Sequence, residues 1–291
     1  MAKSDEKKPE TVASPIGENT VVTITVTKEA HEKEYQKVLA SYAAATTLPG
    51  FRKGKAPKKL VEENVGSIKL IEYVLERLVP DLYTAKINEL KLTPLVSPQV
   101  QAKSIEPGQD WVIEASTAIA PEVKLGDWKK IIKDAAKNLP KKDTPEQKDE
   151  ELATKQLSYV FGALIQAINP KIAPLLLENE TRKQLEDFAR HLASHRIELD
   201  TYLTQIGKDL NALQQEYMAN ALATLQLEFV LLELTKELAI EPTPEEIEAF
   251  AGESLSKMDK KFQDQMRDEA RAIVARKKTV EAIKHEAGIS G

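Results

Sequence analysis

The most concentrated chemistry in this 291-residue sequence lies in a short basic stretch, GFRKGKAPKK, at residues 50–59. It contains five cationic side chains and no acidic one: Arg52, Lys53, Lys55, Lys58 and Lys59. A guanidinium can donate two parallel hydrogen bonds to a carboxylate or a phosphate, and each lysine attracts anions as a point charge. The composition therefore predicts a loop that can bind an anionic surface.

The same stretch contains residues that shape its backbone. Gly50 and Gly54 permit positive φ or a close backbone approach, and a proline lies at each end. Phe51 can fill a small pocket on a partner or stack against it. The alternative is a solvated connection between two helices, with Phe51 packed into its own core. The phosphate-binding pattern G-x-x-x-x-G-K-[ST] is not met, so no nucleotide site is expected.

Two helical patterns and a strand surround the basic stretch. Residues 20–28 alternate with β-branched side chains, which predicts a strand. Residues 29–46 and 58–92 repeat apolar side chains every three or four positions, which predicts helices. We expect the second pattern to divide near Gly66, and Pro80 to kink or break its longer piece.

A hairpin is predicted after these helices. Residues 95–105 and 110–119 are strand-like and flank a turn at residues 106–109, Glu-Pro-Gly-Gln. Residues 121–133 could add a last edge strand. These elements predict an α+β domain over residues 20–134.

The remaining segments are predicted to be a tail, a linker and helices. Residues 1–19 are polar and read as a disordered tail, and residues 135–150 are charged with two prolines, as expected for a linker. Residues 151–291 are expected to form an all-α domain. Its helical patterns cover residues 146–168, 172–196, 209–240, 243–257 and 259–287. Residues 225–234 are apolar on more than one helical face, which predicts the spine of a bundle or a partner-binding face.

Composition excludes several function classes. The chain has no cysteine, which excludes disulfides, thiolate metal sites and cysteine nucleophiles. No apolar run approaches the roughly 18 residues of a membrane span, and the N-terminus lacks the apolar region of a secretory signal. We therefore expect a cytoplasmic protein that does not bind membranes. Residues 1–144 carry a net charge of +3 and residues 145–291 one of −8, so only the front half favours a polyanion.

The sequence carries no recognisable catalytic motif. His191 and His195 are four residues apart, but no Glu follows the first histidine, so the zinc motif H-E-x-x-H is not met. Neither a G-x-S-x-G nucleophile motif nor a dinucleotide fingerprint is present. We predict no enzymatic activity, no metal site and no cofactor.

Residues 48–57, LPGFRKGKAP, resemble the ribosome-docking loop of the trigger factor family, the bacterial chaperones that act where nascent chains leave the ribosome. Residues 121–131, 168–188, 198–209 and 234–250 are similar to other parts of the family. The resemblance covers nearly everything from residue 20 onward. Trigger factors commonly carry a prolyl-isomerase domain between their two halves, and this chain has no segment resembling it.

The resemblance implies an ATP-independent chaperone that docks at the ribosomal exit site and shields nascent or unfolded polypeptides, without prolyl-isomerase activity. Phe51, Arg52 and Lys53 would contact a ribosomal protein at the exit, and the later lysines of the loop would lie near ribosomal RNA. The whole expected docking loop comprises Gly50, Phe51, Arg52, Lys53, Gly54, Lys55, Pro57, Lys58 and Lys59.

The resemblance also implies that the all-α domain forms helical arms around a cradle for clients. The candidate client-binding residues are apolar: Ile172, Leu175, Leu176, Leu203, Ile206, Met258, Phe262, Met266, Ile273 and Val274. A weak homodimer is a further expected partner state. The alternative function is a ribosome- or RNA-associated binding module with a closed helical bundle and no chaperone role.

Overall fold

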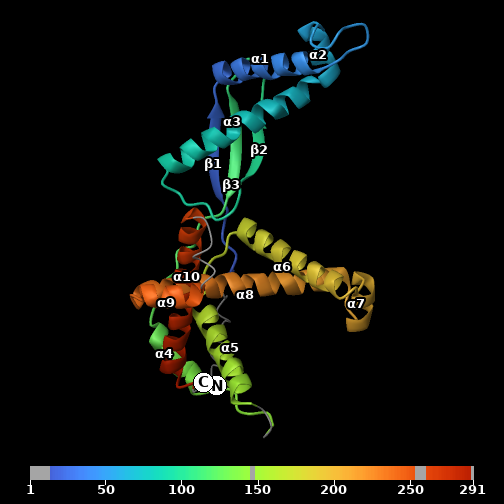
Figure 1. Cartoon of the computed structure of the whole chain (residues 1–291). Helices are drawn as coiled ribbons and strands as arrows, with labels where there is room; N and C mark the ends of the chain where they lie inside the picture. The colour runs from blue at the N-terminus through green and yellow to red at the C-terminus, as the bar shows by residue number, and fades with distance from the viewer. Residues whose placement is uncertain (1–13, 145–147, 253–259, 290–291) are drawn as a thin grey trace, which may run out of the picture. The chain divides into compact units, whose positions relative to one another are not determined.

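The computed structural model describes residues 14–144, 148–252 and 260–289 (Figure 1). The chain divides into two compact units. The first, residues 19–120, is α+β, and the second, residues 121–289 with residues 14–18, is helical. This confirms the predicted fold class of an α+β domain followed by a helical one.

The α+β unit has a three-stranded antiparallel sheet in the order β1-β3-β2. The predicted strand, helices and hairpin are all present, and the second helical pattern divides at Gly66. α3 continues through Pro80, so the predicted break does not occur there. The elements are β1 (Thr20–Val26), α1 (Lys28–Ala45), α2 (Lys58–Val65), α3 (Ser67–Glu89), β2 (Gln99–Ser104) and β3 (Trp111–Thr117).

One face of this sheet forms the core of the unit. Alternate residues of β1 and β3 are buried on that face; α3 crosses it, and α1 packs against α3 (Figure 1). The core strand residues are Val22, Ile24, Val26, Trp111, Ile113 and Ala115. The β-branched alternation seen in the sequence therefore builds a rigid base from which the helices and their connecting loop extend.

A charged contact fixes α1 on α3. Glu34 of α1 accepts hydrogen bonds from Lys37 at 2.8 Å and from Arg77 of α3 at 3.2 Å. The hydrogen bond from Lys37, followed by that from Arg77, holds the pKa of Glu34 below its ordinary value. The carboxylate therefore stays charged at neutral pH and links α3 to α1, the helix that precedes the basic stretch.

The helical unit is built around α8. This helix packs against α5, α6 and α10, while α4 packs against α5 and α10, and α9 against α10 (Figure 1). The elements are α4 (Trp128–Ala136), α5 (Asp149–Ile168), α6 (Pro174–Ser194), α7 (Leu199–Ile206), α8 (Leu210–Glu237), α9 (Pro244–Ala251) and α10 (Lys260–Ala287). Two of these helices were not predicted: α4, where an edge strand was expected, and α7. α7 is a short, eight-residue helix between the left-handed residues Arg196 and Gly207.

The apolar stretch of α8 is mostly core. Leu225, Phe229, Val230 and Leu234 are buried, whereas Leu232 is exposed. By length and composition α8 could cross a membrane. Its contacts with α5, α6 and α10 account for its apolar character, because a helix that packs on several sides needs several apolar faces.

The boundary between the units lies earlier than predicted. Residues 121–133 do not form an edge strand, and their second half starts α4. Trp128 and Ile132 of α4 are buried in the same core as Leu164 of α5 and Leu234 of α8. The polypeptide thus joins the helical unit at residue 121, whereas the predicted helical domain starts at residue 151. Of the predicted linker 135–150, α4 takes the start and α5 the end.

The predicted tail also differs where the structure describes it. Residues 1–13 lie outside the described residues, but residues 14–18 belong to the helical unit. Ile16 forms a parallel β-bridge with Ile172, just before α6. These backbone contacts hold in place a polar segment that composition alone assigns to disorder.

Candidate functional site

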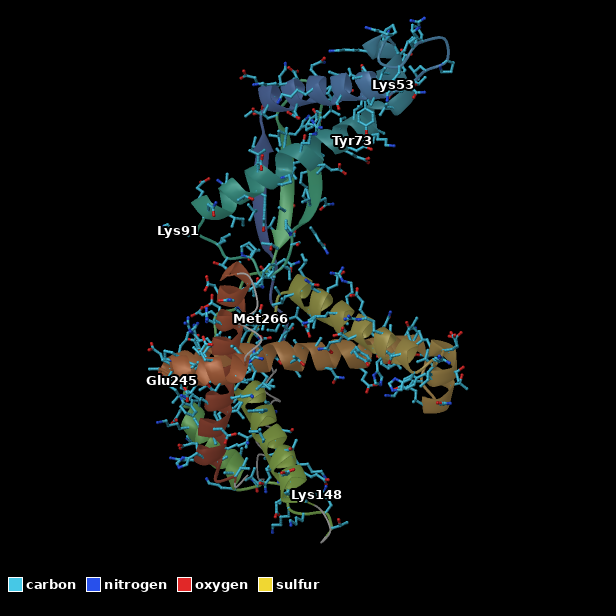
Figure 2. The ribbon with its side chains drawn as sticks, in the orientation of Figure 1. Lys53, Tyr73, Lys91, Lys148, Glu245 and Met266 are labelled. Atoms are coloured by element: carbon cyan, nitrogen blue, oxygen red, sulfur yellow. The ribbon has the colours of Figure 1, made fainter. Side chains whose placement is uncertain are left out.

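The basic stretch forms the loop between α1 and α2, and we call residues 48–57 the basic loop. It lies at one end of the α+β unit (Figure 1), and Figure 2 places Lys53 there. Its ends are anchored, since Leu48 packs on the core and Ala56 is buried in it. The basic loop is therefore an extension of a packed scaffold.

Backbone hydrogen bonds define the course of the basic loop. Phe51 N–H donates to the Leu48 carbonyl at 3.0 Å, and Lys55 N–H donates to the Arg52 carbonyl at 2.9 Å. A third bond, 3.4 Å long, runs from Gly54 N–H to the carbonyl of Thr46 at the end of α1. The two consecutive turns present residues 51–53 in one defined conformation.

The two glycines of the loop are required to different degrees. Gly50 has φ of 82° and Gly54 has φ of 75°, so both adopt the left-handed region that disfavours side chains. A Cβ on Gly54 would lie 3.2 Å from the carbonyl oxygen of Ala44, whereas one on Gly50 would meet nothing within 4 Å. Gly54 thus permits both the backbone angle and a close approach to α1.

We predict that Gly54→Ala destabilises the α+β unit more than Gly50→Ala. Both variants incur about 1–2 kcal/mol for an L-residue with positive φ, and only Gly54→Ala adds a tight contact with α1. Urea unfolding followed by Trp111 fluorescence, with Trp128 replaced by Phe, measures the difference. Equal midpoints for the two variants would contradict the assigned role of the close approach.

The side chains of the basic loop face solvent. Phe51 is 38% exposed, which is unusual for a phenylalanine beside a core, and Arg52 and Lys53 are exposed beside it. Lys55 is exposed as well, and so are Lys58 and Lys59, which the structure places at the start of α2. Within the described part of the chain, none of these five cations lies within ion-pair distance of an acid. Phe51 is not part of the core of its own unit. The alternative interpretation, a solvated connection between two helices with Phe51 packed into that core, therefore loses its main support.

A hydrogen bond across the base of the loop connects the two flanking helices. The hydroxyl of Tyr35 on α1 donates to Glu62 on α2 at 2.6 Å. Partial burial, and then the bond to Glu62, raise the pKa of Tyr35 well above its ordinary value, so the phenol stays protonated. Leu60, on α2 immediately after the loop, is exposed and adds an apolar group that the sequence reasoning missed. Its position directly after Lys58 and Lys59 was the sequence signal that could have indicated an exposed side chain.

The helical unit contains an open apolar groove between α6 and α8, which lie side by side (Figure 1). Its volume is about 1200 Å³, somewhat larger than the roughly 300–1,000 Å³ of pockets that bind drug-sized ligands. We call it the α6/α8 groove. Its apolar lining consists of Pro15, Ile16, Pro174, Leu177, Leu185, Ala189, Met218, Ala219 and Leu222. Sequence reasoning missed these residues, although Met218 and Leu222 show the spacing of one helical face.

The candidate client-binding residues do not form one surface. Ile172, Leu175 and Leu176 are buried in the helical unit, so they are not available to a client in this structure. Ile206, Phe262 and Ile273 are exposed. Leu203, Met266 and Val274 are half-buried, and Met258 lies outside the described residues. The buried three surround the start of α6, where the chain turns into the core.

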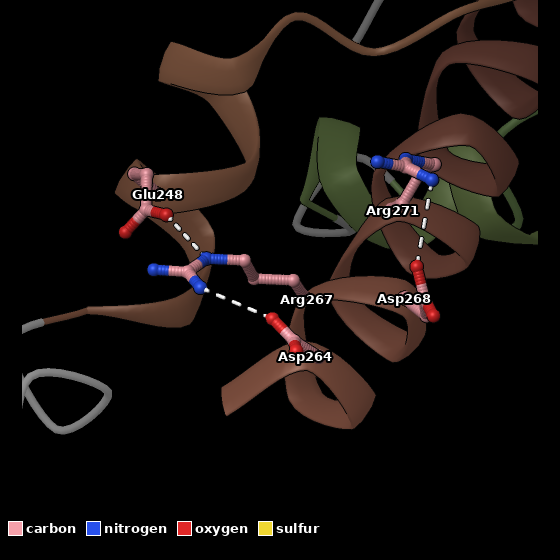
Figure 3. Close-up of polar contacts among 5 residues, drawn as sticks. All are labelled: Glu248, Asp264, Arg267, Asp268 and Arg271. Atoms are coloured by element: carbon pink, nitrogen blue, oxygen red, sulfur yellow. Dashed lines mark hydrogen bonds and ion pairs between the residues drawn. The ribbon is translucent and has the colours of Figure 1, made fainter. Parts of the chain in front are cut away.

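The helix α10 carries both exposed apolar residues and a polar contact with α9. Arg267 of α10 donates to Glu248 of α9 at 2.8 Å and lies 3.6 Å from Asp264 (Figure 3). Arg271 pairs with Asp268 one turn further on. The pair of Arg267 with Glu248 joins α9 to α10, whereas the other two pairs lie within α10, and Phe262 in the first turn of α10 is 60% exposed. The arrangement leaves an apolar face of α10 in solvent.

The histidine pair has no metal-binding geometry. The rings of His191 and His195 are 4.4 Å apart, and Nδ1 of His195 lies 2.9 Å from the carbonyl of His191. In the part of the chain that the structure describes, no group of three or more His, Asp or Glu side chains is placed to hold a metal ion.

Two family models match the chain. Residues 10–155 match the bacterial trigger factor protein (TF) model, and residues 134–285 match the bacterial trigger factor protein (TF) C-terminus model. The two matched ranges overlap, so no stretch lies between them for an inserted domain.

Curated relatives and a solved structure are similar to the chain. Trigger factor of Streptococcus pneumoniae (strain JJA) is 34% identical over 133 residues, covering 45% of this chain and 31% of that protein. Trigger factor of Staphylococcus aureus (strain JH9) is 34% identical over 152 residues, 52% of this chain and 33% of that protein. The chain thus matches about a third of these relatives' length. A solved trigger factor chaperone structure has a TM-score of 0.62 at 14% identity and covers 97% of this chain and 99% of its own, which shows a shared fold.

Proposed function

Because the chain belongs to the trigger factor family, we propose that it is an ATP-independent chaperone that docks on the ribosome through the basic loop and shields unfolded polypeptides with its helical unit. The single observation that carries the docking role is the exposed Phe51, followed directly by the exposed and unpaired cations Arg52 and Lys53, in an anchored loop. An aromatic side chain beside Arg is the typical anchor of a protein interface.

The basic loop and the first residues of α2 contact two kinds of partner in this proposal. Phe51, Arg52 and Lys53 contact a ribosomal protein beside the tunnel exit, since they combine an apolar anchor with a bidentate donor. Lys55, Lys58 and Lys59 lie near ribosomal RNA, where attraction to phosphates weakens as salt rises. The net charge of +3 on residues 1–144 favours this approach, and the −8 on residues 145–291, which make up most of the helical unit, disfavours contact of that part with RNA.

The helical unit provides separate apolar surfaces for a client. A client that binds in the α6/α8 groove or on the exposed face of α10 buries a modest apolar area at each. Each Å² of apolar surface removed from water contributes about 25 cal/mol to the binding free energy. Several weak patches give binding that is broad in sequence and reversible. Ribosome docking raises the local concentration of client, so that weak patches are sufficient.

The remaining parts of the proposal concern enzymatic activity and location. The overlap of the two matched regions supports a chaperone that acts without prolyl-isomerase chemistry. We propose a cytoplasmic location, where ribosomes are available, and a weak homodimer away from them. The alternative, a binding module with a closed bundle, is less well supported because the α6/α8 groove is open.

We predict that the protein delays aggregation of chemically denatured citrate synthase without ATP. Replacing Phe262 and Ile273 together by Ser should shorten that delay by about half or more, because it removes two exposed apolar groups from α10. The matched control replaces Ile68 and Val100, which are exposed on the α+β unit, by Ser, and it should delay aggregation as long as the wild type does. Light scattering gives the time course. No delay at equimolar or excess protein would refute the client-holding role.

A further inference from the structure

Residues 14–17 lie beside Ile172 at one end of the α6/α8 groove, where Pro15 and Ile16 are part of its lining. Ile172 N–H donates to the Pro15 carbonyl at 3.0 Å, and Gly17 N–H donates to the Ile172 carbonyl at 2.9 Å. Ile16 and Ile172 thereby form a parallel β-bridge, and Pro15 and Ile16 line the groove. The chain's own N-terminal segment is thus bound as a short peptide would be.

We propose that residues 14–17 are a tethered occupant of a peptide-binding seat, and that extended apolar client segments bind there by displacing them. This rests on the proposed client-holding function and names the class of segment that the α6/α8 groove takes. The seat consists of the backbone of Ile172 and the start of the groove at Pro174 and Leu177.

The backbone part of the seat is independent of side-chain identity. Both polar groups of Ile172 bond to the main chain of the segment, through residues one before and one after Ile16. Any extended chain with an N–H at the position of Gly17 can make the same pair of bonds, which is the logic of strand addition. The residue at the position of Pro15 need only accept a hydrogen bond, so a proline fits there.

The side-chain part of the seat selects an apolar residue followed by a small one. Ile16 contributes to the lining of the groove but remains 37% exposed, so an aliphatic side chain is accommodated without being enclosed. A Cβ at Gly17 would lie 3.3 Å from both Cβ and the carbonyl oxygen of Lys171. Larger residues at that position would push the two backbones apart.

The tethered segment leaves most of the seat free for a better ligand. The groove retains a volume of about 1200 Å³ beyond residues 15 and 16, and Met218 on its α8 wall is 48% exposed. A client with more apolar residues in sequence would fill this space as well. The tether keeps the local concentration of the N-terminal segment high, so it competes with weak ligands and yields to stronger ones.

The first test uses a fluorescein-labelled peptide with the sequence of residues 14–19, titrated with full-length protein. Ile16→Asp places a charge in the apolar lining, and Gly17→Val places a larger side chain against Lys171, so both should release residues 14–17 from the seat. Each should tighten binding of the free peptide by about 3- to 10-fold, because the empty seat that binds the peptide is then fully populated. Val21→Asp, at an exposed valine of β1, is the matched control and should change nothing. Met218→Asp should weaken binding at least about 3-fold by placing a charge in the groove.

Unchanged peptide affinity in both vacating variants, or in Met218→Asp, would overturn the proposal. A second readout follows displacement directly. The chain has no cysteine, so Glu18→Cys carries one environment-sensitive dye beside the seat. Titration with reduced, carboxymethylated α-lactalbumin, an unfolded client, should change the fluorescence of the dye until it saturates. Native α-lactalbumin should leave the fluorescence of the dye unchanged. A silent dye would also overturn displacement.

These outcomes are separable from failure of the proposed function. Ribosome pelleting of Ile16→Asp should equal that of wild type, since the basic loop is intact. If the wild type fails to delay client aggregation, the chaperone role fails, and the peptide titration still decides whether the seat exists.

Discussion

Alanine at Phe51, Arg52 and Lys53 together will lower the affinity for ribosomes by about 100-fold, with the α+β unit still folded. Loss of one buried aromatic anchor typically costs about 2 kcal/mol or more at an interface, and loss of the two cations brings the total to about 2.7 kcal/mol. All three side chains are exposed, so stability should change by less than about 0.5 kcal/mol. Pelleting with purified ribosomes measures the affinity.

A matched control separates the loop from general charge loss. Lys33, Leu90 and Lys103 are exposed on the same unit and combine one apolar and two cationic side chains, as the loop triple does. Their replacement by alanine should leave pelleting within about 2-fold of wild type at low and at high salt. Undiminished pelleting of the loop triple, with the control also unchanged, would refute the docking role.

Ile132→Ala will destabilise the helical unit by about 2–5 kcal/mol and leave the α+β unit unaffected. Ile132 is fully buried on α4 among residues of α5, α8 and α10, so truncation leaves a cavity in that core. The chain has two tryptophans, and the structure places Trp111 in one unit and Trp128 in the other. Single-tryptophan variants made by Trp→Phe therefore report each unit separately in urea unfolding.

The neighbouring Ile131→Ala is the matched control, because Ile131 is only half-buried on the same helix. It should cost about 1 kcal/mol, in proportion to the apolar area it buries. If Ile132→Ala shifted the Trp111 transition instead of the Trp128 transition, α4 would belong energetically to the α+β unit, as the predicted boundary at residue 134 implied.

Local patterns in the sequence were sufficient for the elements and for the composition of the basic loop. Strand alternation in residues 20–28 and helical spacing in α5, α6, α8 and α10 depend on neighbours two to four positions away. The positive φ of Gly50 and Gly54 likewise follows from the residue type at a tight turn. These features are encoded within short windows, which is why reading them needed no tertiary structure.

Burial could not be predicted in the same way, because it depends on residues far apart in the sequence. Ile172, Leu175 and Leu176 have the same apolar character as Phe262 and Ile273, yet the first three are core and the last two are exposed. Trp128 and Ile132 lie in a segment whose sequence predicted an edge strand, but they are buried in the core formed with α5, α8 and α10.

By itself, the sequence determined that this protein has an α+β part, a helical part and a cationic loop with an aromatic at its tip. Only the tertiary structure decided that Phe51 is exposed, that the α6/α8 groove is open and that residues 14–17 lie in it. The physical reason is that free energy from apolar burial and from β-bridges is gained only between segments brought together by folding. The pairing of Ile16 with Ile172 spans more than half of the chain and has no local signature.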